Sequence, residues 1–254
     1  MTPATTQPRD SAAPAGKISL PAGGHLLMAT PSEMTRRRLE TLLTKEPGTI
    51  AWTDAFSDDD AFWDVGANVG VYSLYAASRG VGAVLAIEPL LENATLLSSN
   101  ILLNGFESRI AVLNAGLSNT SGRRHLLVRD PTAGASGSTL GEPVTFRGKR
   151  FEPRKRQAVL TTTLDALAHE HGAPAHLKID VDGLEPEILD GGRKLLGDPA
   201  LRSVLIELDT RPEGRDRGIE PLLRDHGFEL ASDESGRIED PGFFLRNRVY
   251  RRAA

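Results

Sequence analysis

The clearest candidate for a ligand site is the run Asp-Val-Gly-Ala-Asn-Val-Gly at residues 64–70, between a predicted strand and a predicted helix. Gly66 and Gly70 lack the Cβ atoms that would block a ligand from approaching the backbone, and Asn68 lies between them. Glu88 ends the next predicted strand, at about the distance from Gly66 that lets an acid accept hydrogen bonds from both ribose hydroxyls. Turn and acid together predict a nucleoside site.

The spacing of the glycines argues against a dinucleotide. The G-x-G-x-x-G fingerprint would place glycines where this chain has Asn68 and Val71, so a cradle for a pyrophosphate is not indicated. A nucleoside with an amino-acid end fits better, because Asp64 would hold its ammonium group and backbone donors of the turn its carboxylate. S-adenosylmethionine is such a ligand. The expected cofactor-binding residues from this reasoning are Asp64, Gly66, Asn68, Gly70 and Glu88.

A second group of acids follows two later strands. Polar residues alternate in Lys-Ile-Asp-Val-Asp at 178–182, so Asp180 and Asp182 share one face if the strand continues. Glu207 and Asp209 end the next predicted strand. Asp180, Asp182 and Glu207 are candidate catalytic residues, since a carboxylate of raised pKa can remove the proton of an attacking hydroxyl. Alternatively Asp180, Glu207 and Asp209 would bind Mg²⁺, or Asp182 would cap the following helix.

Several segments, taken in chain order, resemble the FkbM-type methyltransferase family. They are Phe62 to Gly70, Ile87-Glu88-Pro89, Asn100 with Leu103-Asn104, Thr162 to Asp165, and Leu177 to Glu185. The resemblance covers roughly residues 60–210 and departs from the family at Asp182, where a glutamate is usual. It implies a Rossmann-like class I methyltransferase fold, with a seven-stranded, mostly parallel sheet, helices on both faces and an antiparallel last strand. In such folds the residue at the place of Asn114 often contacts the adenine.

The resemblance also implies an activity. Known members mostly methylate hydroxyl groups of polyketides, sugars and glycolipids, so we expect O-methyl transfer from S-adenosylmethionine to a small-molecule or glycan acceptor. Two alternatives stay open: a nicotinamide-dependent oxidoreductase on a similar sheet, and a non-catalytic module that binds S-adenosylmethionine.

Strands and helices alternate along the part of the chain that carries these residues, which is typical of a parallel α/β sheet. The predicted strands are 61–65, 83–87, 110–113, 175–181 and 202–208, and the predicted helices are 36–44, 71–78, 92–103, 164–169, 185–196 and 219–226. Residues 228–231 and 243–250 are expected to close the sheet as an antiparallel hairpin.

The remaining segments divide the chain further. Residues 1–24, rich in Pro, Ala, Gly, Thr and Ser, are expected to form a loose tail, and residues 25–50 an N-terminal cap. The methyltransferase domain then spans 51–254, with an inserted flap at about 118–156. Within the flap, 147–156 holds six basic residues and one aromatic residue, which would suit either an anionic acceptor or a solvated loop.

Composition limits the partners and the chemistry. The 254 residues are 39% hydrophobic and 25% charged, with a net charge of −4 and no cysteine. This balance predicts no general attraction to nucleic acid, and no apolar run reaches the roughly 20 residues of a membrane span. Without cysteine the protein has no thiolate nucleophile, disulfide or thiolate zinc site. We expect a cytoplasmic enzyme whose oligomeric state and metal dependence the sequence leaves open.

Overall fold

The computed structural model describes residues 15–145, 149–211, 213–235 and 244–253. Its centre is a seven-stranded sheet in the order β11-β12-β10-β9-β3-β4-β5. The strands are β3 (Ala61–Val65), β4 (Ala83–Ile87), β5 (Ile110–Leu113), β9 (His176–Ile179), β10 (Ser203–Asp209), β11 (Phe228–Ser235) and β12 (Leu245–Arg252). β12 is antiparallel to β10 and β11, and all other adjacent strands of this sheet pair in parallel. The predicted fold class is confirmed.

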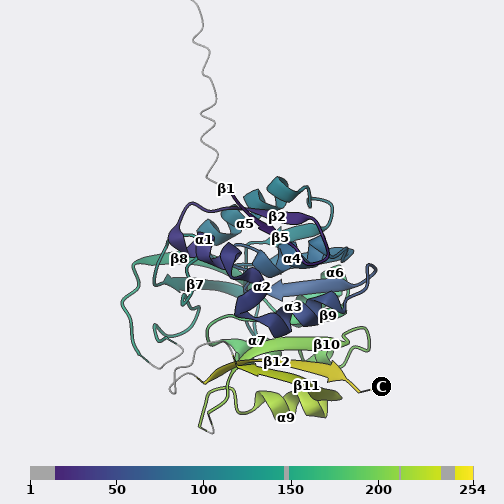
Figure 1. The fold of residues 1–254 in the computed structure, drawn as a ribbon. Helices are drawn as coiled ribbons and strands as arrows, with labels where there is room; N and C mark the ends of the chain where they lie inside the picture. The colour runs from purple at the N-terminus through teal and green to yellow at the C-terminus, as the bar shows by residue number, and fades with distance from the viewer. Residues whose placement is uncertain (1–14, 146–148, 212, 236–243, 254) are drawn as a thin grey trace, which may run out of the picture.

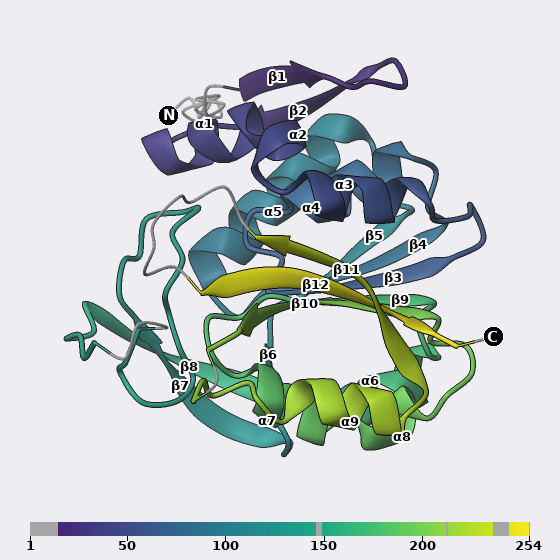
Figure 2. The same ribbon diagram turned by 60° about the horizontal axis from the view of Figure 1, so that its bottom comes forward.

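Helices cover both faces of this sheet (Figure 1; Figure 2). The first group is α1 (Glu33–Glu40), α2 (Leu42–Lys45), α3 (Pro47–Asp54), α4 (Val71–Ser78) and α5 (Leu91–Asn104), and the second is α6 (Leu164–His171), α7 (Glu185–Asp190), α8 (Arg193–Leu196) and α9 (Ile219–Asp225). Each group buries its own hydrophobic core against the sheet, one around Phe62 and Leu74, the other around Leu177 and Ile206. The central strands are buried on both faces, which is why they are almost continuously apolar in sequence.

The sequence predicts the bounds of β3, β4, β5 and α4 without error, and those of α5 to within one residue. The predicted helix 185–196 is instead two helices, α7 and α8, which are separated at Gly191 and Gly192. A Cβ on Gly191 would overlap the carbonyl oxygen of Ser118, so the start of the flap packs directly on this break. Close packing therefore explains why the helix is interrupted there.

An N-terminal hairpin replaces part of the expected loose tail. β1 (Ala15–Ser19) pairs in antiparallel fashion with β2 (His25–Ala29), while residues 1–14 lie outside the described part of the chain. The tail assignment was therefore wrong for residues 15–24. Gly and Pro around the short strand hid it, because the pattern offered few apolar positions.

Two asparagines of α5 anchor this hairpin. Asn100 accepts a hydrogen bond from the Ala29 backbone N–H at 2.8 Å, and its amide donates to the Val69 carbonyl at 2.9 Å. Asn104 likewise accepts from Leu27 N–H at 2.9 Å and donates to the Leu27 carbonyl at 2.8 Å. Through Asn100, the hairpin is therefore connected to the glycine turn that follows β3.

The flap forms a second, three-stranded sheet in the order β6-β8-β7. Its strands are β6 (Gly116–Leu117), β7 (Gly122–Val128) and β8 (Lys155–Thr162). The sequence did not predict β8, because its polar and basic residues were interpreted as loop. Elsewhere in the flap, Val144 forms an isolated bridge with Arg150.

Replacing Asn100 by alanine should lower the free energy of unfolding by about 2–4 kcal/mol. The side chain is fully buried, so its loss leaves the Ala29 N–H and the Val69 carbonyl without a partner. Chemical denaturation would measure the loss. The exposed neighbour Ser99→Ala serves as control and should change stability by less than about 0.5 kcal/mol. Equal stability of both variants would contradict the anchoring role.

Candidate functional site

The backbone conformation of the glycine turn after β3 explains why glycine and asparagine occur there. Gly66, Asn68 and Gly70 all have positive φ, at 81°, 54° and 90°. A Cβ on Gly66 would overlap the Asp180 carbonyl oxygen, and one on Gly70 would overlap the Leu97 side chain. In this structure the two glycines therefore let the turn pack closely on neighbouring elements, and their expected role of admitting a ligand stays a prediction.

Glu88 supports the same turn from the end of β4. One carboxylate oxygen accepts from the Asn68 backbone N–H and the other from the Leu90 N–H, both at 2.9 Å. Burial raises the pKa of Glu88 to about 7, against the opposing effect of these hydrogen bonds. Asn114 donates from its amide to the carbonyls of Glu88 and Pro89, at 2.8 and 3.1 Å. Both predicted residues therefore lie beside the turn.

A buried lysine joins the glycine turn to the second group of acids. Lys178 Nζ lies 3.6 Å from Asp64 Oδ1 and 3.2 Å from Asp180 Oδ2. Burial opposes a charge on Lys178, but Asp180 and Asp64 outweigh it and raise its pKa. Burial likewise opposes ionisation of Asp180, but Lys178 lowers the pKa of that carboxyl. The lysine thus favours the ionised form of Asp180.

Asp64 retains capacity for a further donor. Its side chain is 1% exposed, and Oδ2 accepts a hydrogen bond from Ser73 Oγ at 2.6 Å. Oδ1 has no hydrogen-bond partner among the described residues. The Lys178 ammonium, 3.6 Å away, offsets the charge of this oxygen without hydrogen-bonding to it, which is consistent with a site where a ligand donor supplies the missing hydrogen bond.

The first helices contribute charged and aromatic groups that the sequence reasoning missed. Glu46, between α2 and α3, is 3% exposed; it pairs with Lys45 at 2.7 Å and accepts from Thr49 Oγ1 at 3.3 Å. Burial and then Glu46 raise the pKa of Tyr72, and Lys178 Nζ lies 5.2 Å from the centre of the Tyr72 ring. In sequence, a charged residue between two short helices is typical of a solvated linker, so no pattern marks Glu46.

Glu207 differs from the other acids in having no partner. It directly follows Ile206, which pairs with Ile179 of β9, so Glu207 and Asp180 occupy adjacent strand ends. Among the described residues the Glu207 side chain makes no hydrogen bond or ion pair, and Glu207 is partly buried. Burial and then the charges of Asp180 and Asp182 raise its pKa well above the ordinary value. A raised pKa makes the ionised form of such a carboxyl a stronger proton acceptor.

Asp182 does not share the face of Asp180 in the way expected. β9 ends at Ile179, and Asp182 has a left-handed backbone with φ of 59°, so the strand does not continue. Its carboxylate accepts from the Gly137 N–H of the flap at 2.6 Å, and burial and then Asp180 raise its pKa. The helix-capping alternative is also wrong, because the N-cap of α7 is Leu184.

Asp209 points to a different partner. It forms a two-pronged ion pair with Arg211, with Nε at 2.8 Å from Oδ1, and this pairing lowers the pKa of Asp209. Over the described ranges, no three His, Cys, Asp or Glu side chains form a group that could hold a metal ion. The structure therefore does not assemble Asp180, Glu207 and Asp209 into the Mg²⁺ site that the sequence suggested.

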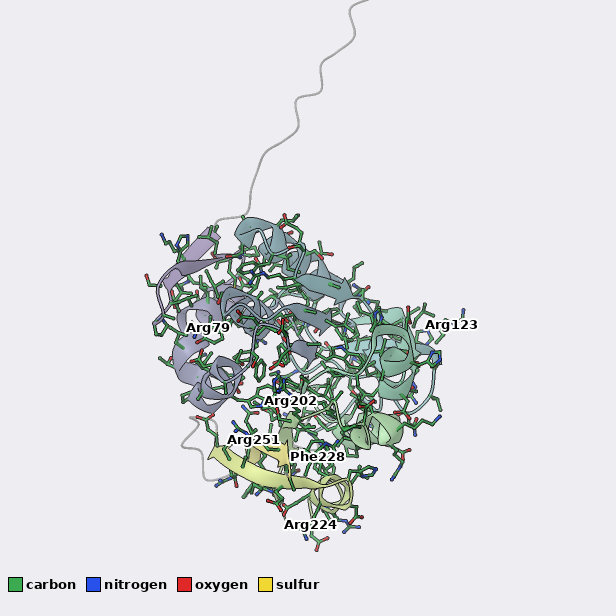
Figure 3. The ribbon with its side chains drawn as sticks, turned by 90° about the vertical axis from the view of Figure 1, so that its right-hand side faces the viewer. Arg79, Arg123, Arg202, Arg224, Phe228 and Arg251 are labelled. Atoms are coloured by element: carbon green, nitrogen blue, oxygen red, sulfur yellow. The ribbon has the colours of Figure 1, made fainter. Side chains whose placement is uncertain are left out.

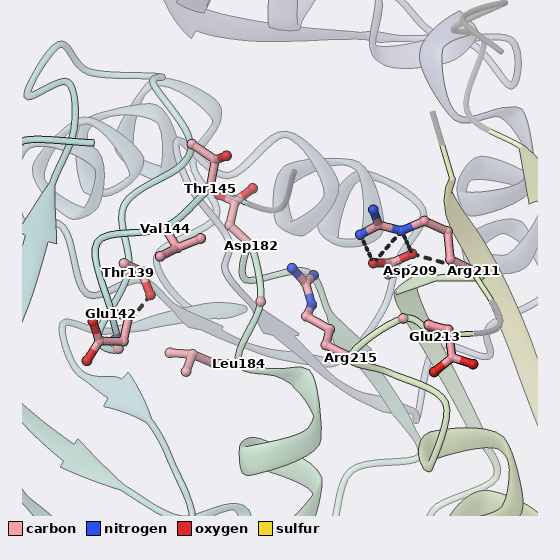
Figure 4. A pocket seen from close by; sticks show the side chains of 13 residues that line it. Thr139, Glu142, Val144, Thr145, Asp182, Leu184, Asp209, Arg211, Glu213 and Arg215 are labelled. Atoms are coloured by element: carbon pink, nitrogen blue, oxygen red, sulfur yellow. Dashed lines mark hydrogen bonds and ion pairs between the residues drawn. The ribbon is translucent and has the colours of Figure 1, made fainter. Parts of the chain in front are cut away.

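A cavity of about 400 Å³ opens next to these acids (Figure 4). Flap residues between 139 and 145, the turn at 182–184, and residues 209, 211 and 213–215 contribute to its walls. Arg215 extends between the Asp182 turn and the Asp209 ion pair, and it contacts Glu185 at 3.3 Å and Asp216 at 3.1 Å. Burial raises the pKa of Glu185 to about 7, against the opposing charge of Arg215. The cavity is thus lined by mutually paired charges of both signs.

A smaller apolar hollow of about 40 Å³ lies at the ends of β3 and β4. Val65 lines it from the sheet, and Leu126 and Leu140 line it from the flap. The flap also contacts the glycine turn, since the Asn68 amide donates to the Ala135 carbonyl at 2.8 Å. In this conformation the hollow accommodates only one or a few water molecules, so a purine ring would require the flap residues to move.

The sequence comparisons agree with one another. A family model described as "Methyltransferase FkbM domain" matches residues 64–230. Methyltransferase sdnD of Sordaria araneosa is 31% identical over 195 residues, which cover 68% of this chain and 74% of that protein. The AMB antimetabolite synthetase AmbE of Pseudomonas aeruginosa is 28% identical over 220 residues, which cover 71% of this chain but 10% of that protein.

Solved structures with the same fold are also methyltransferases. Magnesium protoporphyrin IX methyltransferase (ChlM) of Synechocystis PCC 6803, solved with bound SAM, has a TM-score of 0.52 and 12% identity, over 87% of this chain and 85% of that chain. The tRNA m1G37 methyltransferase of M. jannaschii has a TM-score of 0.50 and 12% identity, over 95% of this chain and 58% of that one. At this identity the likeness shows the fold alone, a class I methyltransferase fold.

Replacing Lys178 by methionine should lower the free energy of unfolding by about 3 kcal/mol, because the change leaves the buried Asp64 and the partly exposed Asp180 without their cation. Adding Asp180→Asn should recover part of that loss, since one uncompensated charge is then removed. Denaturant titrations would test both, with the exposed Lys194→Met as control. A Lys178→Met variant as stable as the control would show that the lysine does not hold the acids together.

Proposed function

Because the chain belongs to the FkbM methyltransferase family, we propose that it is an O-methyltransferase that methylates a hydroxyl group of a sugar, glycolipid or polyketide-type small molecule. The family assignment favours methyl transfer over the nicotinamide-dependent alternative. The observation that carries the hydroxyl proposal is Glu207, an unpartnered carboxyl of raised pKa at the end of β10. A hydroxyl acceptor must lose its proton during transfer, so it needs such a base.

The residues around the glycine turn suit S-adenosylmethionine, the methyl donor of this family. When bound, it supplies a methyl group attached to a positively charged sulfur. Asp64 Oδ1, which has no hydrogen-bond partner in the described chain, would receive the ammonium of its amino-acid end. Glu88 would receive the ribose hydroxyls with the lone pairs that the turn leaves free, and the apolar hollow beside Val65 would hold the base once the flap moves.

The surroundings of each acid give it a different proposed role in the reaction. Lys178 lowers the pKa of Asp180, so Asp180 stays ionised at neutral pH and is a poor proton acceptor. Burial and then the negative charge of Asp180 raise the pKa of Glu207, which makes Glu207 the better proton acceptor. Asp182, bound to the flap at Gly137, is proposed to position the flap over the reacting groups.

The cavity beside Asp182 is the proposed acceptor site. Arg211 and Arg215 are both paired with acids, so neither offers an uncompensated charge to an anionic ligand. Paired carboxylates and guanidinium groups supply many acceptors and donors at fixed positions, while Leu184 and Val144 supply apolar surface. This lining suits an acceptor with several hydroxyl groups better than an anionic one.

The proposal is tested by incubating the purified protein with S-adenosylmethionine that carries a deuterated methyl group, together with metabolite and glycan extracts of the source cells. Mass spectrometry should find a product that gained one labelled methyl on oxygen. Transfer RNA in a parallel reaction should stay unlabelled. Labelling of RNA, or of nitrogen or carbon in a small molecule, would contradict O-methyl transfer, and binding of the cofactor without any product would favour the non-catalytic module.

Glu88→Gln should weaken the binding of S-adenosylmethionine by about 1.5–3 kcal/mol, because ribose hydroxyls would lose hydrogen bonds to a charged acceptor. Isothermal titration calorimetry would measure the dissociation constant, and the exposed Glu107→Gln is the matched control. Glu88 also supports the turn, so a thermal melt of each variant is needed to show that the fold is intact. Unchanged affinity in a folded Glu88→Gln variant would remove this residue from the cofactor site.

Glu207→Gln should lower kcat by about 10²- to 10⁴-fold, the usual contribution of a general base, while the affinity for S-adenosylmethionine stays the same. The pH profile gives a second readout. In the wild-type protein, activity should rise with pH as Glu207 loses its proton, and Asp180→Asn should shift this rise to lower pH because a neighbouring negative charge is removed. A shift to higher pH, or full activity of Glu207→Gln, would exclude Glu207 as the base.

A further inference from the structure

The flap sheet has one face that no other element of the described structure covers. In the β7–β8 pair, directly opposed residues lie on the same face, and this outer face carries the pairs Arg123–Leu160, His125–Ala158 and Leu127–Arg156. Continuing the alternation by one step adds Arg129 and Arg154, both exposed. The inner face instead packs Leu126, Val128 and Val159 against Leu90.

The arginines of this outer face form no ion pair. Within the residues that the structure describes, this holds for Arg123, Arg129, Arg154 and Arg156, although Arg154 and Arg129 lie close enough to Asp130 for their charges to help lower its pKa. The basic residues of the inner face differ: Arg124 pairs with Glu187 at 2.5 Å, and Lys155 pairs with Glu92 at 2.6 Å. The strand alternation thus places Lys155 on the inner face and Arg156 on the outer face, where Arg123 and Arg156 carry positive charge without an ion-paired acid in a chain of net charge −4.

Apolar side chains lie among these charges. Leu160 is 69% exposed, the largest exposed fraction among the large exposed hydrophobic residues of the described chain. Ala158 is exposed beside it, and Leu127 is partly exposed on β7. Arginines at both ends of an apolar strip match the chemistry of an amphipathic segment that carries acids on either side of an apolar stripe.

The length and width of the outer face match those of a short α-helix. From residue 123 to 129 the strand extends about 20 Å, and two strands with their side chains are about 10 Å wide. An α-helix of about 14 residues is about 21 Å long and 10–12 Å wide. Larger polyanions fit less well, because the acids Asp130 and Glu152 stand at one end of the face and would meet the continuous negative charge of a nucleic acid or an anionic membrane.

We propose that the outer face of the β7–β8 sheet binds an acidic amphipathic helix of a partner protein. The same flap supplies residues 139–145 to the acceptor cavity, so a partner held here would stand next to that cavity. In Figure 3, Arg123 lies at the periphery of the molecule, on the opposite side from Arg251 of β12. The face is therefore remote from the last strands of the main sheet, and the proposal does not depend on the chemistry of the cavity.

The proposal is tested with a fluorescent helical peptide of about 14 residues that has glutamates on both sides of a leucine stripe, and with a peptide that has lysine in place of glutamate. Fluorescence anisotropy should show that the acidic peptide binds and the basic one does not. Arg123→Glu combined with Arg156→Glu should weaken binding by about tenfold or more, and Leu160→Ser by a few fold. The control Arg217→Glu combined with Arg251→Glu has the same net charge and should bind as the wild type does.

Two further probes decide between classes of partner. Vesicles containing phosphatidylserine and a single-stranded RNA are titrated against the same variants. Tighter binding of either probe than of the acidic peptide, lost in the Arg123→Glu and Arg156→Glu variant, would overturn the proposal in favour of a membrane or an RNA. Absence of peptide binding, or equal loss in the control variant, would overturn it as well. Circular dichroism of each variant shows that the flap mutations leave the fold intact.

Discussion

The arrangement of the site depends on one buried cation. Lys178 on β9 lies between Asp64 on β3 and Asp180 at the end of its own strand, with both its own side chain and that of Asp64 at most 2% exposed. The positive charge of Lys178 offsets the cost of placing these carboxylates where little water reaches them. Lys178 lowers the pKa of Asp180 against the opposing effect of burial. Glu207 has no ion-paired cation among the described residues, and burial and then the charge of Asp180 raise its pKa.

The same region explains how distant parts of the chain meet. The glycine turn packs on the Asp180 carbonyl, is hydrogen-bonded by Glu88, and binds the flap through Asn68 and Ala135. The N-terminal hairpin reaches the turn through Asn100 of α5. The glycine turn, the acid cluster and the flap are therefore in direct contact, and a movement of the flap would change the packing at the turn.

Much of this could be predicted from sequence. β3, β4 and α4 are buried apolar segments bounded by glycines, and the acids at the strand ends follow from the parallel order of the sheet. β8 could not be predicted, because its outer positions are polar and its apolar inner positions are few. The role of Lys178 could not either, since it depends on which strands are neighbours. The pairing of Asp209 with Arg211 was also missed, because it depends on the conformation of the loop that follows β10.

The central claim is that the negative charge of Asp180, which Lys178 stabilises, adds to burial in raising the pKa of Glu207. The most direct measurement is the pKa of Glu207 itself, from a ¹³C NMR titration of its carboxyl carbon, assigned by comparison with Glu207→Gln. The account predicts a pKa well above the ordinary glutamate value of 4.5, which falls when Asp180 is replaced by asparagine. An ordinary pKa, or one that Asp180→Asn leaves unchanged, would contradict it.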